Sequence, residues 1–466
     1  MTVQDHTRRP WRLLAAVLAL PLAVAALPAL ADEAPGEEKG FWEREKLTGD
    51  WGGVRSDLAD RGVELTATYT AETLGNLSGG IRRRAVAAGL LQGDLDINLD
   101  KLVGWQGAKI HATAFHIQGR QLTPNFIGGL IPVSSVEAVP ATRLFSLWME
   151  QAVLDDKVSL RFGSVPMQEE FYTSTYATYM VNSAFGWPAI YAANLPSGGG
   201  GYPLSNMGTR LKVKPTDEIS LMAAVFTGNV APGTNVGNDA QRRNRSGVDF
   251  SFDSPPIWFG EASYSINQDK DSTGLPATFK LGGFYYNGKV ADQHYDETGL
   301  SLGSGATTNI ARNHRGNWAV YGIVDHMLWK RQGTLDSGVA AFFRTTVMPE
   351  DRNQMNFWLD TGLSLKGTFE GRDDDIAAIG FAYGKMSDEL AARDADARRF
   401  GTATAPDHDF EAVIEVNYAY AVTPWWTLTG FGEYQFHPGG SATLPTNGAK
   451  AIPDATVLGL RTGFKL

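Results

Sequence analysis

The sequence contains no cysteine among its 466 residues, so it can form neither a disulfide nor a metal site with thiolate ligands. It also has no apolar run long enough to cross a bilayer as a helix beyond about residue 31. Basic residues are fewer than acidic ones, 41 against 51, which argues against nucleic acid as a partner. These absences are compatible with an extracytoplasmic protein that has no disulfide bonds and no membrane-spanning helix.

Residues 1–31 are predicted to be a secretory signal peptide. They combine a basic start, a mostly apolar stretch over 13–30, and Ala29 and Ala31 at the small positions of a cleavage site before Asp32. An uncleaved anchor is the alternative, but Pro21 and Pro28 and the Ala-x-Ala end favour cleavage. Cleavage removes three arginines and one aspartate, which leaves 38 basic and 50 acidic residues.

A two-residue alternation of apolar and polar side chains runs from residue 63 to the end of the chain. It is clearest over 63–72, 94–100 and 410–420, where Glu, Asp, Thr and Asn share one parity and apolar residues share the other. Successive side chains of a strand point to opposite faces, so each segment has one apolar and one wet face. Many such strands, with this many charges on the wet face, predict an all-β transmembrane barrel with lipid outside and water inside.

The strand count is expected to be sixteen. Seventeen candidates can be counted, but bacterial barrels of this kind have an even number of strands. The weakest candidate, 248–252, stops at Ser254-Pro255-Pro256 and is set aside because proline cannot donate to an interior ladder. Short turns are then expected at one rim, and the opposite rim should carry the longer connections, near 73–90, 119–143, 166–207, 288–315, 386–408 and 437–454.

Residues 32–62 are predicted to form a periplasmic lead and one short helix before the barrel of 63–466. Asp50 is the expected N-cap of this helix, and Gly62 the residue that ends it. The chain ends Phe464-Lys465-Leu466 rather than in the terminal aromatic residue common among outer-membrane barrels.

The connection 166–207 is unusually aromatic for a loop in water. Its rings can be buried only inside the barrel, so it is expected to fold inward and narrow the pore. Arg161 precedes this loop and Arg210 follows it, both on wet parities, and Glu169 and Glu170 are placed to pair with them.

Several segments together resemble the OprB-like carbohydrate-selective porins of Gram-negative outer membranes. They include Gly49-Asp50-Trp51-Gly52-Gly53, Leu102-Val103-Gly104-Trp105-Gln106-Gly107, Leu160-Arg161-Phe162-Gly163, Val181-Asn182-Ser183, Tyr202-Pro203-Leu204 and Asp325-His326-Met327-Leu328. The resemblance covers nearly the whole chain after the signal. It implies a sixteen-stranded passive channel that favours sugars, which periodicity alone does not.

Guanidinium groups can bridge neighbouring sugar hydroxyls, and the C–H face of a pyranose packs on an aromatic ring. The candidate constriction and substrate-binding residues are Arg120, Arg161, Glu169, Glu170, Tyr172, Asn182, Trp187 and Arg210. The plainer interpretation is that the charges only keep the lumen wet and the rings only pin the loop to the wall.

Motifs for chemistry are weak. The G-x-S-x-G at 299–303 lies in a polar loop, the acidic residues of 94–100 lack the glycine of a calcium loop, and His111 and His116 face opposite ways on one strand. We therefore expect no catalytic residue, metal or cofactor. The expected function is facilitated diffusion of monosaccharides such as glucose, and of small oligosaccharides, into the periplasm; a general or anion-selective porin is the alternative. The expected partners are sugars and outer-membrane lipid, with the barrel a monomer or homotrimer.

Overall fold

The computed structural model describes residues 40–233, 239–269, 271–334, 336–367 and 369–466. Contacts divide the chain into the units Met1–Gly40 and Phe41–Leu466, and the second unit contains the barrel. The predicted signal peptide 1–31 and most of the predicted lead lie outside the described residues.

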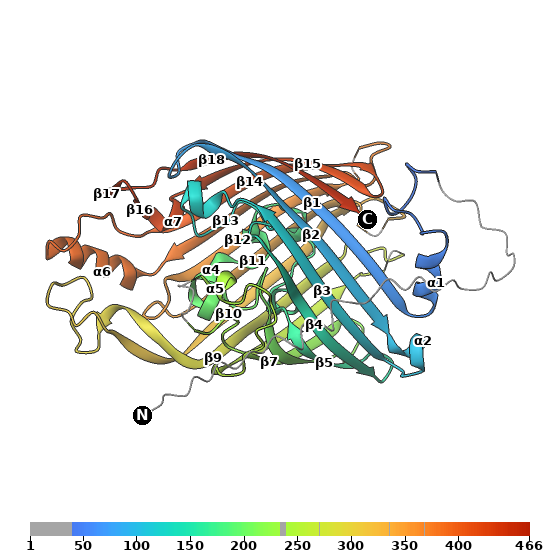
Figure 1. Ribbon diagram of the computed structural model, residues 1–466, viewed down its shortest axis with the longest axis horizontal. Coiled ribbons are helices and arrows are strands. Elements are labelled where there is room, and N and C mark those ends of the chain that lie inside the picture. Colours follow the sequence, from blue (N-terminus) through green and yellow to red (C-terminus); the bar gives the residue numbers. More distant parts are fainter. Residues whose placement is uncertain (1–39, 234–238, 270, 335, 368) are drawn as a thin grey trace, which may run out of the picture. The chain divides into compact units, whose positions relative to one another are not determined.

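Sixteen antiparallel strands form one closed barrel, as predicted (Figure 1). Each strand pairs with the next along the chain, and β1 closes the barrel by pairing with β18, with Tyr69 opposite Phe464. The barrel strands are β1 (Val63–Ser78), β2 (Arg84–Asn98), β3 (Ala108–Gly119), β4 (Ala141–Val153), β5 (Val158–Val165), β6 (Asn206–Val213), β7 (Ile219–Thr227), β8 (Pro256–Ile266), β9 (Ala277–Asp296), β10 (Ala311–Lys330), β11 (Gly338–Val347), β12 (Met355–Lys366), β13 (Ile376–Met386), β14 (Phe410–Thr423), β15 (Trp426–Phe436) and β18 (Ala455–Lys465). A separate hairpin consists of β16 (Thr443–Leu444) and β17 (Asn447–Ala451).

The alternation of the sequence matches the two faces of the barrel wall. On β14, Ile414 and Val416 are exposed on the outside, where lipid lies, while Glu411 and Glu415 are fully buried on the inside. Large aromatic residues are exposed on the outer face of several other strands, among them Trp258, Tyr264, Tyr285, Trp318 and Tyr434. The inward glutamates are covered by loops that fold into the barrel, and this burial was not expected from a wet strand face.

The connections divide between two rims, which we call the short-turn rim and the long-loop rim. The short-turn rim includes residues 154–157, 214–218 and 424–425, and the long-loop rim includes 120–140, 166–205, 387–409 and 437–454. Two expected loops are shorter than predicted, because β1 and β2 continue through most of 73–90 and β9 and β10 through half of 288–315. A long loop between β7 and β8, residues 228–255, was missed as a connection of this rim, although its segment 248–252 is indeed not a strand.

Short helices occupy the turns and loops. They are α1 (Val54–Asp60), α2 (Leu99–Val103), α3 (Met167–Glu170), α4 (Ala189–Asn194), α5 (Ala240–Arg243), α6 (Asp388–Arg399) and α7 (Pro438–Ser441), with single turns η1 (Thr123–Ile127), η2 (Tyr176–Tyr179), η3 (Ser183–Phe185) and η4 (Pro196–Gly198). Among the described residues, no helix is both long enough and apolar enough to span a membrane.

Helix α1 begins differently from the prediction. Its N-cap is Gly53, at φ 95°, rather than Asp50. The left-handed backbone at Gly52 and Gly53 turns the chain so that the Asp50 carboxylate accepts from the backbone N and the hydroxyl of Ser56, at 2.9 Å each. Gly62, at φ 87°, follows the end of the helix as expected.

The α1 segment fastens the end of the chain to the barrel. Arg55 donates to the carbonyl of Leu466 at 3.1 Å and to that of Gly49 at 2.7 Å, and its guanidinium lies 4.1 Å from the centre of the Trp51 ring. We expect Arg55→Ala to destabilise the barrel by about 1 kcal/mol, the usual net value of such bonds at a partly exposed site. The unfolding temperature in detergent, read from the gel shift on heating, should fall by a few degrees. Arg61→Ala, which removes only an exposed pair with Asp57, is the control and should leave it unchanged.

Candidate functional site

The loop 166–205 folds into the barrel, as the excess of rings predicted. Phe171, Tyr172 and Tyr191 are fully buried and pack against rings that the strands point inward. Phe171 stacks on Phe259 with ring centres 4.8 Å apart, and Tyr172 meets Tyr191 edge to face at 5.3 Å. The loop is therefore a packed part of the barrel interior on the side of β7–β13.

Buried glutamates on the wall hold the two inward loops by their backbone. Glu411 accepts from the amides of Leu130 and Ile131 in loop 120–140, at 2.8 and 2.9 Å, and from Gly439 in α7 at 2.8 Å. Glu415 accepts from the amides of residues 181 and 182 in loop 166–205, at 2.8 and 2.7 Å. These loop amides are buried or partly buried and have no neighbouring strand to bond to, so the carboxylates of the barrel wall accept their hydrogen bonds instead.

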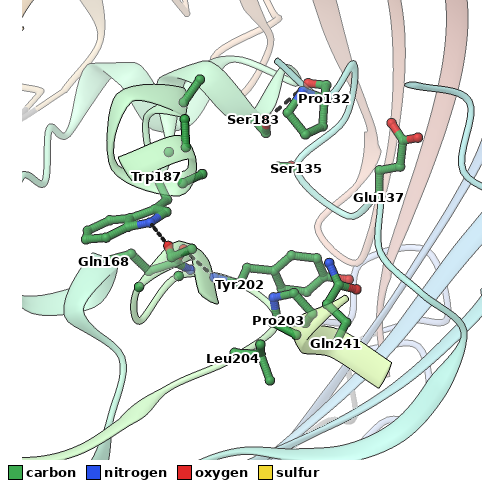
Figure 2. A pocket seen from close by; sticks show the side chains of 18 of the residues that line it. Pro132, Ser135, Glu137, Gln168, Ser183, Trp187, Tyr202, Pro203, Leu204 and Gln241 are labelled. Atoms are coloured by element: carbon green, nitrogen blue, oxygen red, sulfur yellow. Dashed lines mark hydrogen bonds between the residues drawn. The ribbon is translucent and has the colours of Figure 1, made fainter. Parts of the chain in front are cut away.

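Two cavities lie on either side of α3. The outer cavity, of about 580 Å³, is lined on one side by loop 120–140 and on the other by loop 166–205 (Figure 2). The inner cavity, of about 520 Å³, opens toward the short-turn rim, because Lys214, Asp217 and Glu218 line it. Gln168 borders the outer cavity, whereas Glu169 and Glu170 border the inner one. Helix α3 therefore lies between the two cavities.

Four charged side chains form one ion cluster beside α3. Glu170 accepts from Nη1 of Arg161 and, at 2.8 Å, from Nε of Arg210. Glu150 of β4 accepts from the same two guanidinium groups, at 3.1 and 2.6 Å. The cluster contains two positive and two negative charges, so its net formal charge is zero.

The two arginines differ in what they offer to a solute. All three nitrogens of Arg210 are bonded, the third to the hydroxyl of Ser159 at 2.7 Å, and its side chain is 4% exposed. Arg161 is 17% exposed, and its Nη2 has no protein partner among the described residues. Arg161 is therefore the arginine of the pair that can donate into the lumen.

A stack of flat groups on the wall continues from Arg161. Its guanidinium lies 3.5 Å from the centre of the Trp148 ring, and Trp148 stacks on His111 at 4.7 Å. His111 contacts Asp96 at 2.7 Å, and the hydroxyl of Thr113 donates to Asp94 at 2.7 Å. The exposed Glu169 of α3 lies within electrostatic range of this wall.

Sequence reasoning did not place Glu150, Trp148, His111 or Asp94 at the site. Parity could have given their common face, but which of these residues lie beside α3 depends on the register between neighbouring strands. Glu150 lies opposite Arg161, which in turn lies opposite Arg210. The signal that could have found them is this register, which becomes visible only once the turn lengths are known.

The remaining candidates lie in three different places. Tyr172 donates to Asp360 at 3.3 Å, and its ring lies under the guanidinium of Arg344. Asn182 donates to Glu433 at 2.9 Å. Both residues are buried, and both bonds join loop 166–205 to the barrel wall. Trp187 is half-buried and lines the outer cavity. Arg120 is exposed beyond the end of β3, 4.9 Å from the centre of the Phe126 ring, and is not part of the ion cluster.

Metal ligation has no support in the geometry, since the described part of the chain contains no group of three or more His, Asp or Glu placed to hold an ion.

A sequence profile of the OprB family, described as carbohydrate-selective porins, matches residues 82–466, which is most of the chain. The protein belongs to the OprB family. It is therefore a carbohydrate channel of the Gram-negative outer membrane and not an enzyme, as the resemblance implied.

The chain is also similar to known proteins and to a solved structure. The chain is 23% identical to Porin B of Pseudomonas aeruginosa over 415 residues, 84% of this chain and 87% of that protein. It is 21% identical to the putative porin QuiX of Acinetobacter baylyi over 448 residues, 90% of this chain and 93% of that protein. The high-pH structure of Pseudomonas putida OprB superposes with a TM-score of 0.80 at 22% identity, covering 92% of this chain and all of that one. This last similarity supports the fold.

Proposed function

We propose that this channel passes uncharged monosaccharides such as glucose, and small oligosaccharides, by facilitated diffusion into the periplasm. The ion cluster beside α3 carries the proposal, because it offers donors and acceptors to hydroxyl groups without a net charge that would concentrate ions. Arg161 and Glu169 are the proposed sugar contacts, and Glu170, which is bonded to Arg210, holds Arg161 in place. Tyr172 and Asn182 support the loop, and Arg120 lies at the outer mouth.

The alternative of an anion-selective porin has less support. Each arginine of the cluster is bonded to two carboxylates. The inner cavity that follows is lined by six carboxylates and three lysines. A path with this balance does not favour anions over neutral solutes. The barrel closes on itself within one chain, so each chain is proposed to be a complete pore, whether the assembly is a monomer or a homotrimer.

Planar-bilayer recording with sugar titration tests the proposal. Glucose should reduce the ionic conductance of the wild-type channel in a saturable manner, while the reversal potential in a KCl gradient should show no preference for chloride. A sugar acid such as gluconate at the same concentration should block less. A chloride-selective current that glucose leaves unchanged would establish the anion-selective alternative instead.

A further inference from the structure

The indole of Trp187 forms one wall of the outer cavity and is held rigidly there (Figure 2). Its Nε1 donates to the carbonyl of Gly198 at 2.9 Å, and its ring lies 5.0 Å from that of Tyr191. A Cβ at Gly201 would come within 2.4 Å of the indole Cδ1, and one at Gly199 within 3.1 Å of Cζ2. The backbone of the glycine run 198–201 therefore packs directly against the indole ring, and it can do so because these residues have no side chain.

Polar groups suited to hydroxyls surround this ring. Gln168 accepts from the amide of Tyr202 at 2.7 Å, and Gln241 accepts from the amide of Val139 at 2.7 Å. Each bond orients a glutamine through its carbonyl oxygen, and neither amino group has a protein partner among the described residues. The other hydrogen-bonding side chains that line the cavity include Gln121, Ser134, Ser135 and Ser183.

We infer that the outer cavity is a sugar-binding site in its own right, which receives a pyranose before it reaches the ion cluster at α3. The C–H face of the sugar packs on Trp187, and the amino groups of Gln168 and Gln241 donate to its hydroxyls. The volume of about 580 Å³ is within the range of small-molecule pockets. This inference rests on the proposed function and adds a second sugar position, separated from the first by α3.

Among the described residues, no lysine or arginine lines the outer cavity itself, and the guanidinium of Arg461 behind it donates to the lining hydroxyls of Ser134 and Ser135 at 3.1 Å each. An anionic solute would meet the two carboxylates of Glu137 and Asp239 in this lining, whereas a neutral pyranose meets a ring and the amide groups of glutamines. The class of ligand expected at this site is an uncharged sugar with equatorial hydroxyls, whose C–H groups form a flat apolar face.

Two substitutions disrupt the stacking surface of the Trp187 ring in different ways. Trp187→Ala deletes the ring, and Gly201→Ala drives a methyl group into it without requiring an unusual backbone angle. Gly430→Ala is the control, since Gly430 lies on β15 outside the lining of the cavity and an added Cβ there would meet no atom within 4 Å. Trp187→Phe should retain most of the stacking.

Glucose block of ionic current, with the sugar added at the long-loop side, is the measurement. The half-blocking concentration should rise about fivefold for Trp187→Ala and for Gly201→Ala, equivalent to about 1 kcal/mol, and stay near the wild-type value for Gly430→Ala and Trp187→Phe. Heat-shift gels identify any variant whose barrel has not folded. Wild-type-like block in both Trp187→Ala and Gly201→Ala would overturn this inference but leave the proposed function standing. Absence of glucose block in the wild type would refute the proposed function.

Discussion

Replacing Glu411 with alanine should open the outer cavity and raise the ionic conductance of the channel. The Glu411 carboxylate accepts from three backbone amides, those of Leu130, Ile131 and Gly439, and is fully buried. A buried donor left unpaired costs about 1–3 kcal/mol, so leaving all three unpaired should destabilise the inward-folded conformation of loop 120–140 by several kcal/mol. Leu130 lines the outer cavity, so its release widens the path.

Single-channel conductance and the rate of protease cleavage within 120–140 on the outer face would measure this effect. Ile414→Ala is the control, because Ile414 is on the same strand but exposed on the lipid side. It should leave both quantities unchanged. Equal conductance of Glu411→Ala and the wild type would mean that the loop is held by its apolar packing alone.

Replacing Arg161 with alanine should convert the channel to a cation-preferring one and weaken sugar block. The substitution leaves Glu150 and Glu170 with one arginine between them, so the cluster acquires a net negative charge. A unit charge at 4 Å changes the energy of an ion by about 1 kcal/mol even in bulk water, which shifts the cation-to-anion permeability ratio roughly fivefold or more. Loss of the free guanidinium donor should weaken glucose block by roughly 3- to 10-fold.

The reversal potential in a KCl gradient and the glucose titration are the two readouts for Arg161→Ala. The double variant Arg161→Ala/Glu150→Gln restores the charge balance, so its selectivity should return toward that of the wild type while its sugar block stays weak. Arg210→Ala should instead lower the yield of folded barrel, because that side chain is buried and bonded through every nitrogen. An unchanged permeability ratio in Arg161→Ala would place the selective point elsewhere in the lumen.

The barrel itself was predictable because apolar and polar residues alternate within a strand, which shows that its two faces lie in different environments. On β14, the outward Ile414 and Val416 alternate with the inward Glu411 and Glu415, and no partner strand is needed to see this. The strand number followed from the same alternation, from the even number of strands in such barrels, and from Pro255 and Pro256, which end the candidate that was set aside. The N-cap of α1 was not predictable in this way, because the left-handed turn at Gly52 and Gly53 moved the Asp50 carboxylate to Ser56.

Local patterns in the amino-acid sequence were sufficient for the strands, their faces and the inward direction of the aromatic loop, since each depends on the contrast between lipid, water and buried surface. The sequence already placed Glu170 to pair with Arg161 and Arg210. The other partners described above for inward side chains were decided by the closed barrel. Glu150 meets Arg161 and Arg210 because three strands align in register. Glu411 loses its water because two loops, distant from it in the chain, cover it. Such contacts join residues far apart in sequence, and a pattern with a period of two residues contains no information about them.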